Sequence, residues 1–408
     1  MYNLVDFISI LLLIIITLFI ALRWPAVSRI LFIALAVRLI FLFINNHIFY
    51  LPDGDMDAKN FEQLAWKFSQ DGFYNNFNNY SGPGAYFYSF ILAIPYSLFG
   101  RSILLVQSLS ILFGIGSVFL GWLVAKKLWD NSTAIKVAWS IALFPTLVSY
   151  SVLTMREVYI SFFLLLAMYG IVNWVRFNNY KSIILIFISF IAATFFHGSL
   201  IIGLFVFISI VTLDSFKKAF KSLLILQINF KILIIIILFS SILGLYFTNK
   251  ISLPYIQTFS ISSSPSFLKE TINLKVKGEA SYPEWTKIDT TIELYYKVPI
   301  RSVYFLFSPF PWDVKKLSHL VGLLDGFLYM IFVYLIFRNR KTIWKDPALR
   351  IILMILLAYF IIFGVGVGNF GSAIRHRSKF TIELILLAAP LIPKFIFLNK
   401  KKLRKYLK

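Results

Sequence analysis

Long apolar runs rich in Ile, Leu and Phe alternate along this chain with short polar segments. About 20 consecutive apolar residues in a helix cross a bilayer, and the runs near that length predict eleven membrane-spanning helices. Their predicted ranges are 4–22, 27–46, 102–125, 133–150, 155–174, 182–196, 197–213, 232–248, 318–337, 350–366 and 380–397. His197-Gly198-Ser199 interrupts one apolar stretch and predicts a tight turn between two short helices. The apolar segment 83–99 is interrupted by Pro95, so we interpret it as re-entrant or interfacial.

Composition supports the same class of protein. The chain of 408 residues is 59% hydrophobic and 14% charged, whereas soluble domains are about half apolar and a quarter charged. The runs are continuous and do not alternate as the strands of a membrane β-barrel do. The sequence therefore predicts an all-α polytopic protein that forms one integral-membrane domain over residues 1–408. Cysteine is absent, which excludes disulfides and thiolate metal sites.

The distribution of basic residues predicts the topology. Net charge is +22, and Lys and Arg concentrate in the cytoplasmic loops of membrane proteins. Basic residues follow the first, third, fifth, seventh, ninth and eleventh predicted helices: Arg23 and Arg29; Lys126 and Lys127; Arg176 and Lys181; Lys217, Lys218, Lys221 and Lys231; Arg338, Arg340, Lys341 and Lys345; and the tail KKKLRKYLK. Eleven spans place all six segments in the cytoplasm, with the N-terminus outside and the C-terminus inside. The charge therefore indicates anionic lipid, and no nucleic-acid-binding motif is present.

The same topology places the polar segments with unusual chemistry on the outer face. The two large outer loops are 47–101 and 249–317, and shorter ones lie at 151–156, at His197 and at 367–379. We expect the protein in a bacterial cytoplasmic membrane, with its active site facing outside. Basic residues outside break the positive-inside pattern, so Arg375, His376 and Arg377 are candidates for binding phosphate.

The first outer loop holds a short acidic island, Pro52–Gly72, with Asp53, Asp55 and Asp57 at alternate positions. The whole chain has only 18 Asp and Glu residues, and carboxylates at a membrane boundary are costly unless they are solvated, paired or used. A spacing of four places Asp57 on one helix face with Phe61 and Ala65, in the first turn of a short helix. One aspartate can cap that helix, and we expect Asp53 to be either that cap or a solvated carboxylate. Capping leaves the other carboxylates to be explained by function.

The pattern Asp57-x3-Phe61-x3-Ala65, followed by Gly72 and PGAYFYSFILAIPYSLFG, resembles the first outer loop of GT-C membrane glycosyltransferases. This resemblance implies a GT-C-like fold and a sugar donor carried on a polyprenyl phosphate. It also implies that an acidic residue of this loop activates the acceptor, with Asp57 first by spacing and Asp55 as its competitor. Many members have Asp-Glu here, whereas this chain has Asp57-Ala58.

Four later segments extend the resemblance. FPTLVSYSVLTMREVYISFFLLLAMYG implies a second acidic site at Glu157 beside Arg156, and AATFFHGSLIIGLF implies that His197 lies near the lipid phosphate. FLFSPFPWDVKKL is similar to the entry into a late helix, and GNFGSAIRHRSKF is similar to the Arg-rich turn before the last one.

Simpler interpretations exist for the same residues. Arg156 and Glu157 can form an ion pair at a helix end, and His197 can be a turn residue at the interface. The order Arg156-Glu157, a helix pair and His197-Gly-Ser is also similar to EpsG-like and Wzy-type polysaccharide polymerases. A flippase for lipid-linked oligosaccharides is the non-enzyme alternative. Transporters place charges near the bilayer midplane, and here mid-helix charges are few.

We therefore expect an inverting hexosyl- or pentosyltransferase of surface-glycan assembly. Its partners would be a polyprenyl-linked sugar donor, a glycan, lipid or protein acceptor, and membrane lipids. Asp57 or Asp55 would act as the base, and Arg375, Arg377 and His197 would stabilise the departing phosphate. Hard cations favour carboxylates, but no fixed ligand motif is present, so the sequence predicts no metal and no other cofactor.

Overall fold

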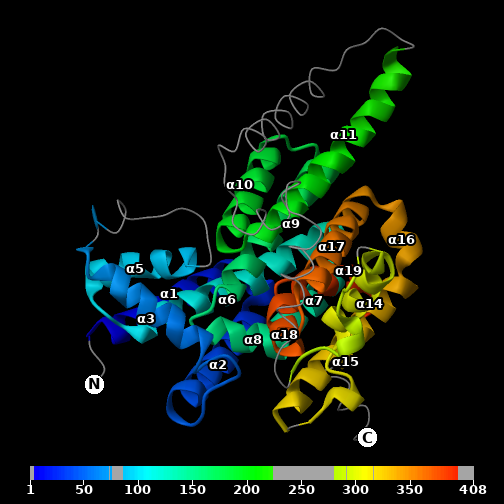
Figure 1. Cartoon of the computed structure of the whole chain (residues 1–408). Coiled ribbons are helices and arrows are strands. Elements are labelled where there is room, and N and C mark those ends of the chain that lie inside the picture. Colours follow the sequence, from blue (N-terminus) through cyan, green and yellow to red (C-terminus); the bar gives the residue numbers. More distant parts are fainter. Residues whose placement is uncertain are drawn as a thin grey trace, which may run out of the picture.

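The computed structural model describes residues 4–72, 74–75, 86–223, 280–290, 292–315 and 317–393, with the side chains of 215–223 and 317–318 left aside (Figure 1). Regular structure in these ranges is helical, apart from one isolated antiparallel bridge between Ser281 and Asn369. The protein is an all-α polytopic membrane protein, as its sequence predicts. The helix predicted at 232–248 and most of the predicted loop 249–317 lie outside the described residues.

The described residues form a series of α-helices in chain order. They are α1 (Leu4–Arg23), α2 (Pro25–His47), α3 (Asp57–Ser69), α5 (Phe87–Phe99), α6 (Ile103–Leu128), α7 (Asn131–Leu143), α8 (Pro145–Val152), α9 (Glu157–Phe177), α10 (Lys181–Phe196), α11 (Ile201–Leu223), α14 (Glu293–Phe307), α15 (Leu317–Arg338), α16 (Arg340–Lys345), α17 (Pro347–Gly366), α18 (Phe370–Ser378) and α19 (Thr381–Ala388).

Six helices of the described part are long and apolar enough to cross a membrane: α1, α2, α6, α9, α15 and α17. The single helix predicted at 133–150 is instead a pair, α7 and α8, bent by 55° at Phe144-Pro145; counted as one span, it is a seventh. Proline lacks the N–H that would continue the helix, which explains the bend. The segments predicted at 182–196, 197–213 and 380–397 form shorter apolar helices, so the count of eleven stays a prediction.

The two ends of the helix bundle carry different charged residues. At the end that we call the basic end, defined by Lys127, Arg176 and Asp346, Arg176 donates to the carbonyl of Lys127 at 2.6 Å and forms an ion pair with Asp346. Glu157 lies at the opposite end of α9. The 21 residues of α9 extend over about 30 Å at 1.5 Å per residue, which matches the apolar thickness of a bilayer. We call the end with Glu157 the site end.

Close helix contacts hold the bundle together. A Cβ added at Gly114 of α6 would lie 2.8 Å from Ser151 of α8 and 2.9 Å from the buried Arg38 of α2. A Cβ at Gly170 of α9 would lie 2.7 Å from Ile186 of α10. Small residues let helices approach in this way inside membranes. Arg38 donates to the carbonyls of Ala34 and Ala142, so this mid-helix charge is bound inside the bundle.

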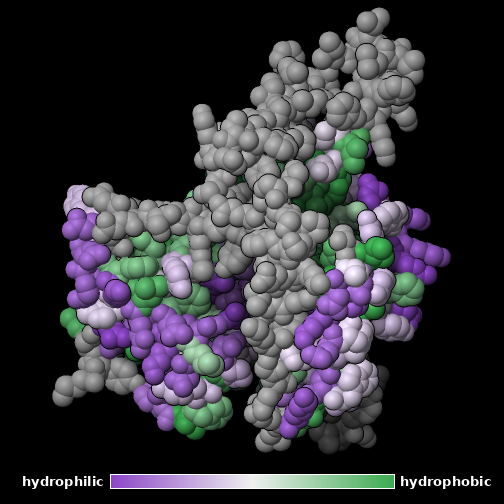
Figure 2. Space-filling model, viewed as in Figure 1, coloured by the Kyte–Doolittle hydropathy of each residue, from purple (hydrophilic) through white to green (hydrophobic). Residues whose placement is uncertain are grey.

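Helices α3 and α5 form a layer beside the main bundle. Figure 2 shows hydrophilic side chains over α3 and apolar ones over α5. The Ser89 hydroxyl donates to the carbonyl of Phe61 at 2.9 Å, and the Tyr96 hydroxyl donates to the Glu62 carboxylate at 2.9 Å. Pro95 lies within α5, and the 13 residues of α5 are too few to span a bilayer, which agrees with the prediction that 83–99 is not a spanning helix. The layer positions the first turn of α3 against the bundle.

Candidate functional site

Arg375 and Asp57 form an ion pair at the site end of the bundle. Asp57 begins α3, as its spacing predicts, and Arg375 lies in the last turn of α18. Asn369 caps α18 by accepting from the N–H of Ser372 at 2.8 Å, which fixes the start of this short helix. The side chain of Asp57 is 44% exposed and that of Arg375 is 18% exposed. The pair therefore closes a buried cluster and faces outward on its carboxylate side.

Glu157 lies beneath this pair and is almost completely buried. Its carboxylate is 3.6 Å from the ammonium of Lys379 and 3.9 Å from Nε of Arg375. The ion pairs of Glu157 are thus made with α18 and the residue that follows it, and not with its neighbour Arg156, whose guanidinium donates to the carbonyl of Phe196 at 2.9 Å. Arg375 bridges an exposed carboxylate and a buried one.

Two histidines complete the cluster. The rings of His197 and His376 lie 5.4 Å apart, edge to face, and both pack against Phe363. Nδ1 of His376 is 2.6 Å from the ammonium of Lys379. Burial of the ring, and then the nearby charges of Lys379, Arg375 and Arg156, hold the pKa of His376 well below its ordinary value of 6.5. His376 is therefore neutral near pH 7, accepts from Lys379 at Nδ1 and carries its proton on Nε2.

Lys379 is a site residue that the sequence did not single out. It is fully buried between Glu157 and His376, and burial lowers the pKa of its ammonium well below the ordinary value. A signal was present, because Lys379 follows Arg375 by four residues and so continues the same helix face. The resemblance to an Arg-rich turn indicated only Arg375, His376 and Arg377.

Arg377 points away from the charged cluster around Arg375, although both residues belong to α18. Its guanidinium is completely buried, 2.7 Å from Asp325 of α15, and also donates to the carbonyl of Ser308 at 2.7 Å. Residues two apart on a helix face in different directions, which explains why Arg375 and Arg377 separate. Arg377 ties α18 to α14 and α15, and the structure gives no support to its predicted contact with phosphate.

The two other aspartates of the acidic island also separate from Asp57. Asp53 accepts a hydrogen bond from the Tyr150 hydroxyl at 2.8 Å and does not cap α3, whose N-cap residue Met56 makes no capping hydrogen bond from its side chain. Of the two roles predicted for Asp53, the helix cap is therefore wrong. Asp55 is exposed and lies 3.5 Å from Lys59 of the next turn. Of the three, Asp57 is the aspartate that forms an ion pair with the buried cluster.

An apolar groove of about 740 Å³ reaches the edge of this cluster. Helices α5, α6, α9 and α10 form it, and its lining includes Leu92, Phe113, Phe163, Ala192 and Phe196. Phe196 ends α10 directly before His197, and its carbonyl accepts from Arg156. One end of the groove therefore meets the cationic side of the cluster. The site joins a long apolar surface to a group of cations and carboxylates.

No protein-family model, curated protein or solved structure matches this chain. Within the described ranges, His, Asp and Glu form no group of three or more that could hold a metal ion.

Proposed function

We propose that this protein is a membrane glycosyltransferase that uses a polyprenyl-linked sugar donor. The observation that supports this proposal most is the ion pair between Arg375 and Asp57, together with an apolar groove whose lining ends at Phe196, directly before His197. Such a donor has a long apolar tail, a phosphate or diphosphate and a sugar. The groove suits the tail, the cations suit the phosphate, and the half-exposed carboxylate suits a base that meets the acceptor.

The reaction follows from these positions. The Asp57 carboxylate takes the proton of the acceptor hydroxyl while that oxygen forms a bond to the anomeric carbon of the sugar. The bond from that carbon to the phosphate oxygen breaks, and the polyprenyl phosphate or diphosphate leaves with the electron pair. Attack from the face opposite the phosphate inverts the anomeric centre. The donor and the acceptor together balance this reaction, and no oxidant or reductant is consumed.

The charges around Arg375 suit a phosphate that enters at this point. In the structure Asp57 forms an ion pair with the guanidinium of Arg375. That guanidinium is a forked donor, and a bound phosphate would compete with Asp57 for it. Release from Arg375 would leave Asp57 free to accept a proton. Nε2–H of the neutral His376 is a further donor for the departing oxygen, with Arg156 and His197 beside it.

The proposed membrane arrangement follows the two ends of the helices. The basic end carries Lys127 and Arg176 and would face the cytoplasm of a bacterial cell. The site end would then face outside, where surface glycans are assembled. Eleven spans with the C-terminus inside remain the proposed topology. Asp71→Cys and Lys341→Cys in this cysteine-free chain test it, because only the first should react with an impermeant maleimide in intact cells.

The direct experiment supplies the purified protein in lipid nanodiscs with undecaprenyl phosphate and undecaprenyl diphosphate that carry labelled sugars. We expect one class of donor to release its carrier lipid when an acceptor is added. Turnover that requires a complete oligosaccharide repeat on diphosphate would identify a polymerase instead. Folded protein that turns over none of these donors would contradict the proposal.

A further inference from the structure

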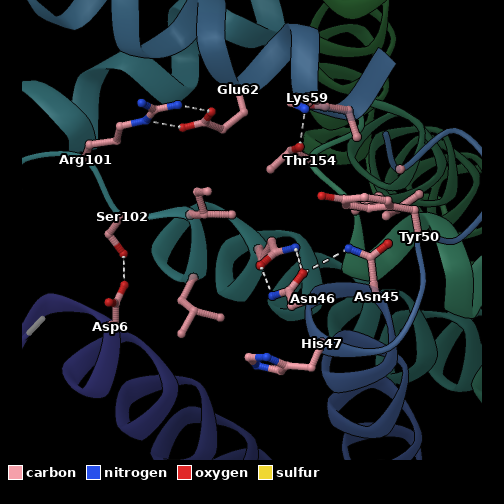
Figure 3. Close-up of a pocket in the computed structure, with 16 residues that line it drawn as sticks. Asp6, Asn45, Asn46, His47, Tyr50, Lys59, Glu62, Arg101, Ser102 and Thr154 are labelled. Carbon is pink, nitrogen blue, oxygen red and sulfur yellow. Dashed lines mark hydrogen bonds and ion pairs between the residues drawn. The ribbon is translucent and has the colours of Figure 1, made fainter. Parts of the chain in front are cut away.

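A second, polar cavity lies at the site end and is separate from the charged cluster (Figure 3). It has a volume of about 600 Å³ and is enclosed by the start of α1, the end of α2, the first turns of α3 and the start of α6. Ala58, Lys59 and Glu62 of α3 line it, whereas the neighbouring Asp57 contacts Arg375. The cavity and the proposed base are therefore adjacent on the first turn of one helix.

Side-chain amides form one wall of this cavity. Asn46 and Gln107 hydrogen-bond each other twice, at 2.9 and 3.1 Å, and Asn45 donates to Asn46 at 2.9 Å. Asn45 also accepts from the N–H of Leu51 at 3.1 Å, and a Cβ at Gly54 would lie 2.8 Å from its amide oxygen. The loop after α2 thus fixes the orientation of these amides. Each has two N–H donors, and its bonds to the described residues use one of them.

The charged residues that line the cavity have polar or charged partners, and Lys59 at its mouth lies 3.5 Å from Asp55. The Arg101 guanidinium binds both oxygens of Glu62, at 2.9 and 2.8 Å, and the Tyr96 hydroxyl adds a third hydrogen bond. Asp6 accepts from Ser102 at 2.5 Å. A phosphate or carboxylate ligand would have to break the pair between Arg101 and Glu62 and would lie near the carboxylates of Glu62 and Asp6. The lining therefore favours a neutral ligand that is rich in hydroxyl groups.

The mouth of the cavity supplies flat rings. Tyr50 is 59% exposed and His47 is exposed beside it, and both line the cavity. Figure 3 shows these rings near the amides of Asn45 and Asn46. Sugars present hydroxyls around their rim and a less polar C–H face, so amides and carboxylates beside an aromatic ring match both parts. A small charged metabolite or a lipid tail matches neither.

We propose that this cavity binds a neutral saccharide, which is the acceptor of the sugar transfer; the acceptor role rests on the proposed function. A saccharide in the cavity would lie within about one helical turn of Asp57, since a turn rises 5.4 Å. The Asp57 carboxylate, adjacent to the Ala58 wall, would then receive the proton of the attacking hydroxyl. The structure thus assigns donor and acceptor to two sides of the first turn of α3.

The test measures saccharide binding without any donor. Lys59→Cys places one thiol at the cavity mouth of the cysteine-free chain, and its reaction with a maleimide is followed in nanodiscs. The probes are the methyl glycosides of glucose, galactose, mannose, rhamnose and N-acetylglucosamine, with glucose 1-phosphate as the charged comparison. We expect at least one neutral glycoside to slow the labelling in a saturable manner, and Glu284→Cys, exposed elsewhere, to label at an unchanged rate.

The double variant Asn46→Leu/Gln107→Leu tests whether the amide wall of the cavity binds the glycoside. It replaces both partners of the Asn46–Gln107 pair at once, so neither is left opposite an unpaired amide, and it also removes the acceptor of the Asn45 amide. We expect the glycoside concentration that half-protects the thiol to rise at least about tenfold, which corresponds to the loss of two hydrogen bonds. Asn179→Leu, at the opposite end of α9, is the matched amide control and should leave protection unchanged.

Three results would overturn this inference: no protection by any neutral glycoside, stronger protection by glucose 1-phosphate, or full protection in the double variant. These results are distinguishable from failure of the proposed function, because donor turnover is not involved. A protein that binds a glycoside but turns over no polyprenyl donor would keep the cavity assignment and lose the transferase. A protein that turns over donor but shows no protection by glycosides would keep the transferase function and lose the cavity assignment.

Discussion

The guanidinium of Arg375 forms an ion pair with the carboxylate of Asp57 and lies 3.9 Å from the buried carboxylate of Glu157. Arg375 thus connects the last turn of α18 with the first turns of α3 and α9. In the proposed reaction this residue holds Asp57 before the donor arrives and holds phosphate afterwards.

Arg375→Gln should lower kcat/KM for the donor more than the same substitution of an exposed arginine. The variant removes the charge that would bind phosphate, and we expect kcat/KM for the polyprenyl donor to fall by about 10²–10³. Arg375→Lys keeps the charge without the planar fork, so it should retain part of the activity with a raised KM. Arg338→Gln, at an exposed position in the last turn of α15, is the control. Equal kcat/KM for the Arg375→Gln and Arg338→Gln variants would argue against phosphate binding at Arg375.

Filling the apolar groove should affect long donors selectively. Ala192 lines the groove, so Ala192→Trp should occupy the space of the proposed tail. We expect a higher KM for an undecaprenyl donor and an unchanged KM for the same sugar phosphate on a single isoprenoid unit. Ile184→Trp lies on the same helix at an exposed position outside the groove and should alter neither. Steady-state kinetics with both donors distinguish the outcomes. An equal rise in KM for both donors would contradict the placement of the polyprenyl tail in the groove.

Arg377 should matter for folding and not for catalysis. Its charge and that of Asp325 are both buried, and removal of one partner from such a pair costs about 3–5 kcal/mol. Arg377→Met should therefore lower the midpoint of thermal unfolding strongly. Asp325→Leu/Arg377→Met should recover part of that loss, because no uncompensated charge remains. If Arg377→Met left stability unchanged and abolished donor binding, the assignment of Arg377 as a structural residue would be wrong.

His376 should make stability dependent on pH. Its pKa in the folded protein lies well below the 6.5 of the unfolded chain, so the unfolded state binds the proton more readily. The contribution to stability is complete above about pH 6.5 and is lost as the pH falls below that value toward the lowered pKa. The unfolding midpoint of the wild type should fall more between pH 7.5 and 5.5 than that of His376→Gln. Equal falls would show that His376 is not the titrating group.

The sequence predicted the parts of this site that depend on local spacing. A period of four placed Asp57 in the first turn of a helix, and His197 separates α10 from the next helix as the turn signal indicated. The helical class followed from the long apolar runs. These features need only neighbouring residues, which explains why they were accessible.

The partners of the charged residues were not accessible in the same way. Arg375 and Arg377 share one motif, yet Asp57 binds the first and Asp325 binds the second. Which carboxylate reaches which arginine depends on how α3 and α15 pack around α18, and a single sequence carries no direct signal of that packing. The capping role of Asp53 failed for the same reason, because Tyr150 of α8 holds its carboxylate.

The most direct measurement of the central claim compares Asp57→Asn with Asp55→Asn in single-turnover sugar transfer from the polyprenyl donor. Asparagine keeps the size of either side chain and removes its ability to take a proton. Loss of a general base lowers rates by about 10²–10⁴, so the Asp57 variant should show a loss of that size. The Asp55 variant, whose carboxylate is exposed beside Lys59, should transfer at close to the wild-type rate. Wild-type transfer by Asp57→Asn, or an equal loss in both variants, would contradict the account.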